Sequence, residues 1–191
     1  MKKENSKYCM FLDLETGGFN CTKHGICQVG FIVFDTDSYE IVSKSEIKVK
    51  PYFINLQSNE ICQYTEEAFE VNRHNELDLK EHGFTIENVL SVLESVINRY
   101  EIVFFGGHNI KNFDIKFLES VYQLYLNKPF KYDALVCTMN MAKNRLNLKS
   151  NSLINICKHF ELEPKNYHTA MADAEASFEV FRLMRLMPMI K

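Results

Sequence analysis

Three segments of the sequence carry the side chains best suited to chemistry. Residues 11–17 read FLDLETG, residues 107–114 read GHNIKNFD, and residues 168–174 read HTAMADA. Oxygen atoms of carboxylates are the ligands that hard divalent cations prefer, and two such cations can stabilise both the attacking and the leaving oxygen when a phosphodiester is hydrolysed. The segments therefore indicate a two-metal hydrolytic site, built from four carboxylates and a histidine: Asp13, Glu15, Asp114, Asp173 and His168.

The first segment places two acids in an apolar run. Asp13 and Glu15 are two positions apart in a strand predicted at 8–14, so their side chains point to the same face. Burying two unpaired like charges is costly, and a shared cation would remove that cost. The alternative is a pair of acids on a solvent-exposed edge strand, which needs no cation.

The second segment follows a short apolar strand at 102–105 and reaches Asp114 at the start of a helix. Aspartate is favoured there for capping alone, so capping remains an alternative to metal binding. His108 and Asn109, directly after the strand, suit a network that supports a site. Phe113 could stack on a nucleic-acid base at a pocket wall, or pack in the core.

In the third segment His168 precedes Asp173 by five residues. A helix beginning near Ala170 places Asp173 in its first turns and leaves His168 on the preceding loop, where a general base can move. Small alanines around Asp173 allow this helix to approach the sheet closely. By itself His168 is no better a candidate than the other histidines considered, which are His24, His74, His82 and His159.

The three motifs and their order resemble the DEDDh family of 3′-to-5′ exonucleases, which includes DNA polymerase III proofreading subunits and ribonuclease T. The resemblance covers about residues 8–184, and all five active-site residues of the family are matched, by Asp13, Glu15, Asp114, His168 and Asp173. A histidine five positions before the last aspartate, instead of a tyrosine four before it, selects the DEDDh branch over the DEDDy branch.

The resemblance implies a ribonuclease H-like fold and a role for each residue. Asp13, Glu15 and Asp173 would hold the cation that activates water, and Asp13 would also bind a second cation that Asp114 supports. His168 would take the proton from the attacking water. Two Mg²⁺ or Mn²⁺ ions fit this set of oxygen ligands, whereas zinc is disfavoured because no cysteines or further histidines accompany the acids.

The resemblance also implies a pocket for the 3′-terminal nucleotide. Thr16 and Phe113 match positions that line this pocket. Residues 65–72 resemble the segment whose helix packs over the terminal base, which adds Val71 and Asn72 as candidates for substrate binding. The proline that is usual near the start of that segment is absent here, so this part of the resemblance is less specific.

The pattern of apolar residues predicts an α/β fold. An antiparallel meander of three strands is expected at 8–14, 26–35 and 40–50, followed by alternating helices and strands. With the family resemblance, the expected sheet is mixed and five-stranded, three strands forming the meander and two running parallel, with helices on its flanks. Helices are expected near 65 and 85, from about 114, and at 134–142, 152–160 and 170–184.

Length and composition are those of one globular domain. The 191 residues are enough for a sizeable core, and we expect a single exonuclease domain over 1–191 with frayed ends at about 1–7 and 187–191. The sequence has no apolar run long enough to span a membrane and no signal peptide, so we expect a cytoplasmic protein. Its six cysteines form no C-x-x-C pair, and we expect reduced thiols.

A formal net charge of −3 argues against nonspecific binding of nucleic acid through a basic surface. It does not exclude a nuclease, because bound cations would reverse the local sign. The leading hypothesis is an exonuclease releasing nucleoside monophosphates from 3′ ends of single-stranded DNA, with a DNA polymerase as a candidate partner. One alternative is the same chemistry on RNA, and another is a non-catalytic module that binds nucleic acid or a polymerase.

Overall fold

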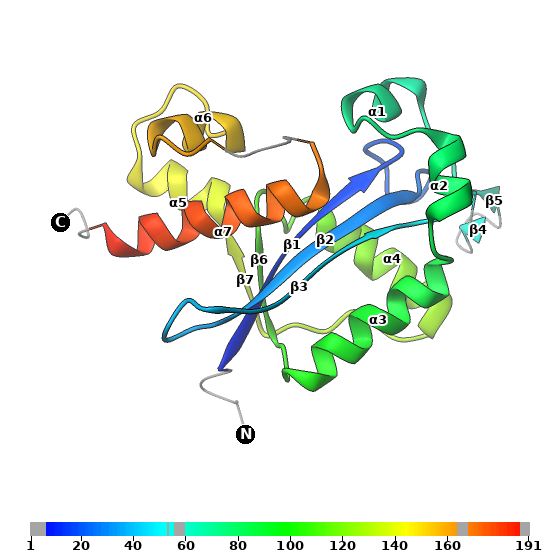
Figure 1. Cartoon of the computed structure of the whole chain (residues 1–191), viewed down its shortest axis with the longest axis horizontal. Helices are drawn as coiled ribbons and strands as arrows, with labels where there is room; N and C mark the ends of the chain where they lie inside the picture. Colours follow the sequence, from blue (N-terminus) through cyan, green and yellow to red (C-terminus); the bar gives the residue numbers. More distant parts are fainter. Residues whose placement is uncertain (1–6, 53, 56–59, 164–167, 188–191) are drawn as a thin grey trace.

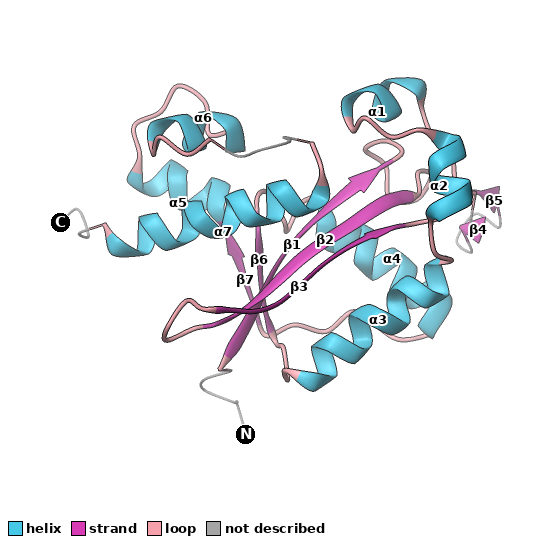
Figure 2. Cartoon of the chain, in the orientation of Figure 1, coloured by secondary structure: helices cyan, strands magenta, loops and turns pink. Residues whose placement is uncertain are grey.

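A five-stranded sheet forms the centre of the protein, shown in Figures 1 and 2. The structure, a computed structural model, describes residues 7–52, 54, 55, 60–163 and 168–187. The strand order is β3-β2-β1-β6-β7, with β1 antiparallel to β2 and parallel to β6. The strands are β1 (Tyr8–Thr16), β2 (Ile26–Asp35), β3 (Ile41–Lys48), β6 (Phe104–Gly107) and β7 (Ala134–Cys137). This arrangement confirms the predicted mixed α/β sheet.

Helices cover both faces of the sheet (Figure 2). On one face lie α3 (Ile86–Arg99) and α4 (Asp114–Leu126), and on the other lie α5 (Thr138–Arg145), α6 (Leu153–His159) and α7 (Ala170–Leu186). Near the end of β1 are the small elements β4 (Ile54–Asn55), β5 (Glu60–Ile61), α1 (Glu66–Val71) and α2 (Glu76–His82).

The alternation of side chains along β1 determines what each face receives. Met10, Leu12 and Leu14 pack into the core cluster that contains residues of α3 and α4. Cys9 and Phe11 pack instead against Phe178 of α7. Because alternate residues of a strand share a face, Asp13 and Glu15 follow Cys9 and Phe11 onto the α7 side. β1 is also a central strand, so an exposed edge strand is excluded as the setting of these two acids.

Two predicted elements differ from the structure. The helix expected at 134–142 is wrong at its start, because residues 134–137 form β7 and pair in parallel with β6. A four-residue apolar run does not distinguish a buried strand from a helix by its periodicity. β6 begins at Phe104 and includes both glycines. A Cβ at Gly106 would lie 2.1 Å from the Phe11 ring, so a side chain there would displace that ring.

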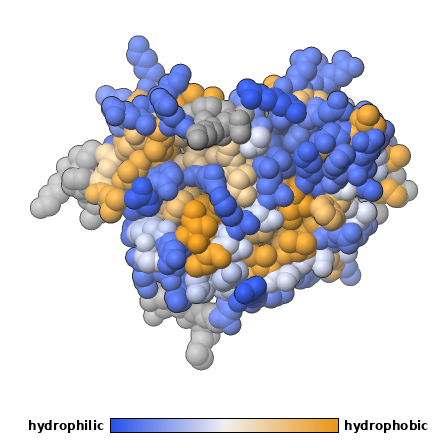
Figure 3. All heavy atoms as spheres, in the orientation of Figure 1, coloured by the Kyte–Doolittle hydropathy of each residue, from blue (hydrophilic) through white to orange (hydrophobic). Residues whose placement is uncertain are grey.

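The face drawn in Figure 3 is mainly hydrophilic with hydrophobic patches. Ile41 and Val42 of the edge strand β3 are among the exposed hydrophobic residues. All six cysteines are free. No helix in the described part of the chain is both long and apolar enough to cross a bilayer. Of the ends predicted to fray, residues 1–6 and 188–191 lie outside the described residues.

Candidate active site

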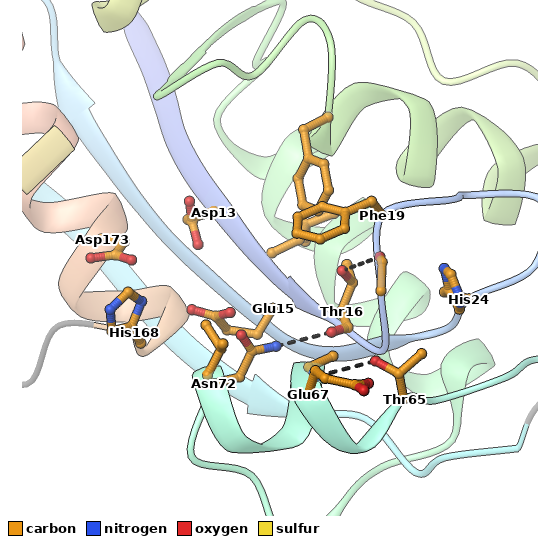
Figure 4. A pocket seen from close by; sticks show the side chains of 15 residues that line it. Asp13, Glu15, Thr16, Phe19, His24, Thr65, Glu67, Asn72, His168 and Asp173 are labelled. Carbon is orange, nitrogen blue, oxygen red and sulfur yellow. Dashed lines mark hydrogen bonds between the residues drawn. The ribbon is translucent and has the colours of Figure 1, made fainter. Parts of the chain in front are cut away.

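Three carboxylates meet where β1 passes the first turn of α7. Asp13, Glu15 and Asp173 each offer an oxygen atom, and these atoms all lie within 4.8 Å of one another. Figure 4 shows the three side chains together, with His168 beside Asp173. The fully buried Ala170, at the start of α7, has no bulk to hold the helix away from the strands. The sheet and this helix therefore bring together acids 158 to 160 positions apart in sequence.

Asp114 lies beside this cluster and is fixed by a different contact. It is 1% exposed, and its Oδ1 accepts a hydrogen bond of 3.0 Å from the backbone N–H of Leu14. The N-cap residue of α4 is Phe113, which makes no side-chain capping bond. Capping alone is thus insufficient to explain Asp114, because its carboxylate binds the strand between Asp13 and Glu15.

The pKa values of the acids are raised because the carboxyl groups are shielded from water and lack enough positive charge nearby. Burial, then the charges of Asp114, Glu15 and Asp173, hold the pKa of Asp13 well above its usual range. Burial and the charge of Asp173 raise the pKa of Glu15 to about 7. Burial also raises the pKa of Asp114 to about 7, although backbone N–H groups oppose the change. Protons or cations must therefore neutralise the cluster.

The residues of the cluster fit a hard divalent cation. The Oδ1 atom of Asp173 is buried and has no hydrogen-bond partner, which leaves an acceptor unsatisfied at a real cost. The three cluster ligands are all carboxylates, and oxygen ligands are those that Mg²⁺ and Mn²⁺ prefer. A cation here would satisfy the orphaned oxygen and reduce the repulsion at the same time.

His168 is held next to Asp173 in an unusual backbone conformation. Its φ angle is 68°, in the left-handed region, which few non-glycine residues adopt. The ring charge and the backbone N–H of His168 both lower the pKa of Asp173, partly opposing the rise caused by burial. The side chain is half-buried and borders the same cavity as the acids. A loop histidine beside the carboxylates is therefore in position to exchange a proton with a bound reactant.

A cavity of about 370 Å³ opens next to the carboxylates and falls within the size range of small-ligand sites. All four residues predicted for substrate binding line it, together with three of the four acids and His168. Asp114 is not among the lining residues. Residues that were not singled out for substrate binding also contribute, and these include Phe19, His24, Thr65 and Glu67.

One wall of the cavity is α1, which is tied to the end of β1. The Nδ2 of Asn72 donates to the backbone oxygen of Thr16 at 2.9 Å, a contact drawn in Figure 4. The N–H of Thr65 donates to the backbone oxygen of Gly17, also at 2.9 Å. Val71 at the other end of the helix remains 56% exposed. The helix predicted over the terminal base is thus anchored where the strand carrying Asp13 and Glu15 ends.

Aromatic rings form the opposite rim. Phe19 is 92% exposed, and its ring meets Phe113 edge-to-face with centroids 6.3 Å apart. Gly18 gives the loop its shape, because its φ is +154° and a Cβ would lie 2.6 Å from the ring of His24. An aromatic residue directly after two glycines was the signal that could have identified Phe19 from the sequence.

His108 does take part in a buried network, but one that supports the scaffold. Its Nδ1 lies 3.0 Å from Oγ1 of Thr138, which also donates to the backbone oxygen of Gly107 at 3.3 Å. Burial lowers the pKa of His108 to about 4, so the ring is neutral. These contacts link the segment that leads to Asp114 with the start of α5.

The chain is similar to known proteins in sequence and in fold. The family model RNase T, described as Exonuclease, matches residues 10–181. The PolC-type DNA polymerase III of Thermotoga petrophila is 29% identical over 192 residues, and that of Thermotoga maritima is 29% identical over 184 residues. These alignments cover 98% and 94% of this chain, but the chain spans only 12% of the length of either relative.

Among solved structures, E. coli exonuclease I in complex with a dT13 oligonucleotide has a TM-score of 0.76 and 16% sequence identity. The match covers 94% of this chain and 41% of that chain. A zinc-bound form of the E. coli exonuclease I complex with single-stranded DNA has a TM-score of 0.77 at 16% identity, covering 95% and 41%. At these identities the likeness shows a shared fold.

Proposed function

This chain belongs to the exonuclease family, as a DEDDh-type 3′-5′ exonuclease, and we propose that it releases nucleoside monophosphates from 3′ ends of single-stranded DNA with two divalent cations. The observation that carries the proposal is the cluster of Asp13, Glu15 and Asp173 at the edge of a cavity of about 370 Å³. We also propose that residues 1–191 form a single exonuclease domain.

Each member of the site has a distinct role in this proposal. Asp13, Glu15 and Asp173 would hold the cations, with Asp13 assigned to both, and Asp114 at the start of α4 would support that arrangement through its hydrogen bond to Leu14 of β1. When bound, the cations supply Lewis-acid stabilisation of the charge that develops on the phosphoryl oxygens. His168 takes a proton from the attacking water. The water oxygen forms a bond to phosphorus while the bond from phosphorus to the 3′ oxygen of the preceding nucleotide breaks. That oxygen takes up a proton from solvent, which leaves a hydroxyl on the shortened strand and a 5′-phosphate on the released nucleotide.

The cavity explains why the proposed cleavage is confined to ends. In this proposal it holds one nucleotide, with the Phe113 ring on one side and α1 on the other. Stacking on an aromatic ring tolerates any base, so we expect little sequence preference. The similarity in fold to exonuclease I, solved with dT13, supports single-stranded DNA as the substrate.

RNA is the second candidate substrate, because the matched family model carries the name of ribonuclease T. Discrimination of the sugar depends on contacts to the 2′-hydroxyl. A DNA polymerase is the proposed partner, because the PolC-type relatives are polymerases that include a segment similar to nearly the whole of this chain. A non-catalytic module is disfavoured by the presence of all five residues of the family site.

The test compares DNA and RNA strands of one sequence, labelled at the 5′ end, with Mg²⁺, with Mn²⁺ and with a chelator. We expect shortening from the 3′ end, release of nucleoside monophosphates, faster decay of DNA, and no reaction with the chelator. Faster decay of RNA would reassign the substrate. Intact strands under every condition, from a protein that binds Mn²⁺, would identify a non-catalytic module.

A further inference from the structure

The first turn of α7 is held by side chains of two strands as well as by its own cap. The N–H of Ala170 donates to Oε1 of Gln28 at 3.0 Å, and the N–H of Met171 donates to Oε1 of Glu46 at 3.1 Å. The Thr169 hydroxyl, which is the local cap, accepts only the N–H of Ala172, at 3.3 Å. The first N–H groups of a helix have no partner within the helix, and local caps usually satisfy them. Here β2 and β3 do so.

The register of the sheet places Gln28, which caps α7, directly beside the acids of β1. Gln28 is the cross-strand partner of Glu15, and Gly30 is the partner of Asp13. Residues opposite each other on neighbouring strands point to the same face. A Cβ at Gly30 would lie 2.2 Å from the carbonyl carbon of Ala170, so the helix rests directly on β2. The strand opposite both acids of β1 therefore also supports the helix that carries the third.

We propose that Gln28 is a positioning residue for the metal site, which sets the distance of Asp173 from Asp13 and Glu15 through its hydrogen bond to Ala170. This inference rests on the proposed function only in taking the three carboxylates as metal ligands. Gln28 is 3% exposed, so water does not compete for its hydrogen bond. Glu46 is exposed, and its contact to Met171 is correspondingly weaker as an anchor.

The alternative is that Gln28 only stabilises the fold by satisfying one helix N–H. The two roles differ in what they change, because a stability contact affects the melting temperature and a positioning contact also affects metal affinity. Residues that orient metal ligands typically change affinity by about 10–100-fold when they are replaced.

The experiment measures Mn²⁺ affinity of the free protein, melting temperature, and kcat and KM on a DNA oligonucleotide. Gln28→Met keeps the unbranched shape and removes the hydrogen-bond acceptor. We expect about 10–100-fold weaker Mn²⁺ binding and a lower kcat, with KM for the oligonucleotide close to that of the unchanged protein. Gln28→Asn is a milder change that retains the amide but shortens it, and we expect an intermediate loss.

Thr85→Ala is the matched control, because Thr85 caps α3 by accepting the N–H of Asn88 and lies outside the site. It should lower the melting temperature without changing Mn²⁺ affinity. If Gln28→Met and Gln28→Asn behave like this control, the positioning role is wrong. Because Mn²⁺ affinity is measured without substrate, a protein that binds Mn²⁺ but cleaves nothing would overturn the proposed function and leave this inference testable.

Discussion

At the scale of single residues, the site is a group of buried and half-buried acids that need a counter-charge. Asp13 is central, because the charges of Asp114, Glu15 and Asp173 all raise its pKa in addition to the effect of burial. Removing one acid should therefore affect metal binding and the stability of the metal-free protein in opposite directions. Metal binding should be lost, and the repulsion in the metal-free protein should fall.

Asp13→Ala should abolish hydrolysis while the fold persists, because Asp13 is the residue assigned to both cations. The metal-free variant should be at least as stable as the unchanged protein. Circular dichroism, melting curves and the labelled-strand assay measure these effects. Asp37→Ala, which removes an exposed acid in the β2–β3 turn, is the control. Near-normal Mg²⁺-dependent activity of a folded Asp13→Ala protein would contradict the assignment.

His168→Ala should slow the chemical step by roughly 10²–10⁴-fold, the usual contribution of a positioned general base. Mn²⁺ affinity and substrate affinity should change little, because the imidazole is assigned to neither. Single-turnover rates at saturating metal measure the effect. His82→Ala, on the exposed side of α2, should keep the normal rate. An equal rate for the two variants would remove His168 from the mechanism.

Stability of the metal-free protein should fall as the pH rises from 5 to 8. Burial raises the pKa of Glu15 and of Asp114 to about 7, above the value of about 4 for unfolded carboxyl groups. The folded protein thus binds protons more tightly than the unfolded chain. This stabilisation is complete below about pH 4 and is lost as the pH rises through about 7.

Melting curves in a chelator measure this dependence, and Mg²⁺ or Mn²⁺ should raise the melting temperature more at pH 8 than at pH 5. Glu15→Gln should reduce the slope between these pH values, because it removes one of the titrating groups. A melting temperature that rises with pH in the chelator would show that the cluster is not short of positive charge.

At the scale of elements, the cavity lies between the end of β1, the anchored helix α1, and the rim formed by Phe19 and Phe113. The two walls differ in kind, since α1 is tied by hydrogen bonds to backbone oxygens of Thr16 and Gly17, whereas the rim is made of rings. Loss of one ring should therefore affect the bound base and leave the carboxylates undisturbed.

Phe113→Ala should weaken use of the oligonucleotide by the amount of one stacking contact, about 1–3 kcal/mol, with Mn²⁺ affinity retained. The reason is that Phe113 borders the cavity but offers no metal ligand. kcat/KM and Mn²⁺ titrations measure the two effects. Phe84→Ala removes a ring that is 57% exposed outside the cavity and should leave kcat/KM unchanged. A loss of Mn²⁺ affinity would mean that the ring also supports Asp114.

The elements carrying the site were largely predictable, because their signals are local. The apolar run with acids two apart identified β1, and the helices expected near 65 and 85 do begin there, where Thr65 and Thr85 cap α1 and α3. β7 was mistaken for part of a helix, because it forms a strand by pairing with β6, which is distant in the sequence. The anchoring of α7 by Gln28 was likewise invisible, because it joins residues 142 positions apart.

At the scale of the whole molecule, the site lies near the end of the sheet where α1 and α2 are grouped, as Figure 1 shows. In the proposed function a strand must enter this end with an unpaired terminus, because a single nucleotide is assigned to the cavity. Comparing linear, circular and duplex substrates therefore tests whether the site accepts only a free end, separately from the catalytic roles of its residues.

A circular single strand should resist cleavage under conditions that degrade the linear strand completely. A blunt duplex should be degraded more slowly than the single strand, because the terminal pair must first separate at an energetic cost. Gel analysis of linear, circular and duplex DNA of the same sequence measures these differences. A circle cut as fast as the linear strand would identify an endonuclease and contradict the proposed end-binding cavity.

The bond between Asp114 and the N–H of Leu14 has a consequence for measurement. β6 pairs with β1 only at Cys9, Met10 and Phe11, so at Leu14 the neighbouring strand has already ended and a side chain takes the place of the missing ladder bond. Deuterium uptake at this one amide would consequently follow the integrity of the catalytic centre. Its protection should vanish in Asp114→Ala while Val29, its cross-strand partner, stays protected, which provides a reporter of the site that requires neither substrate nor metal.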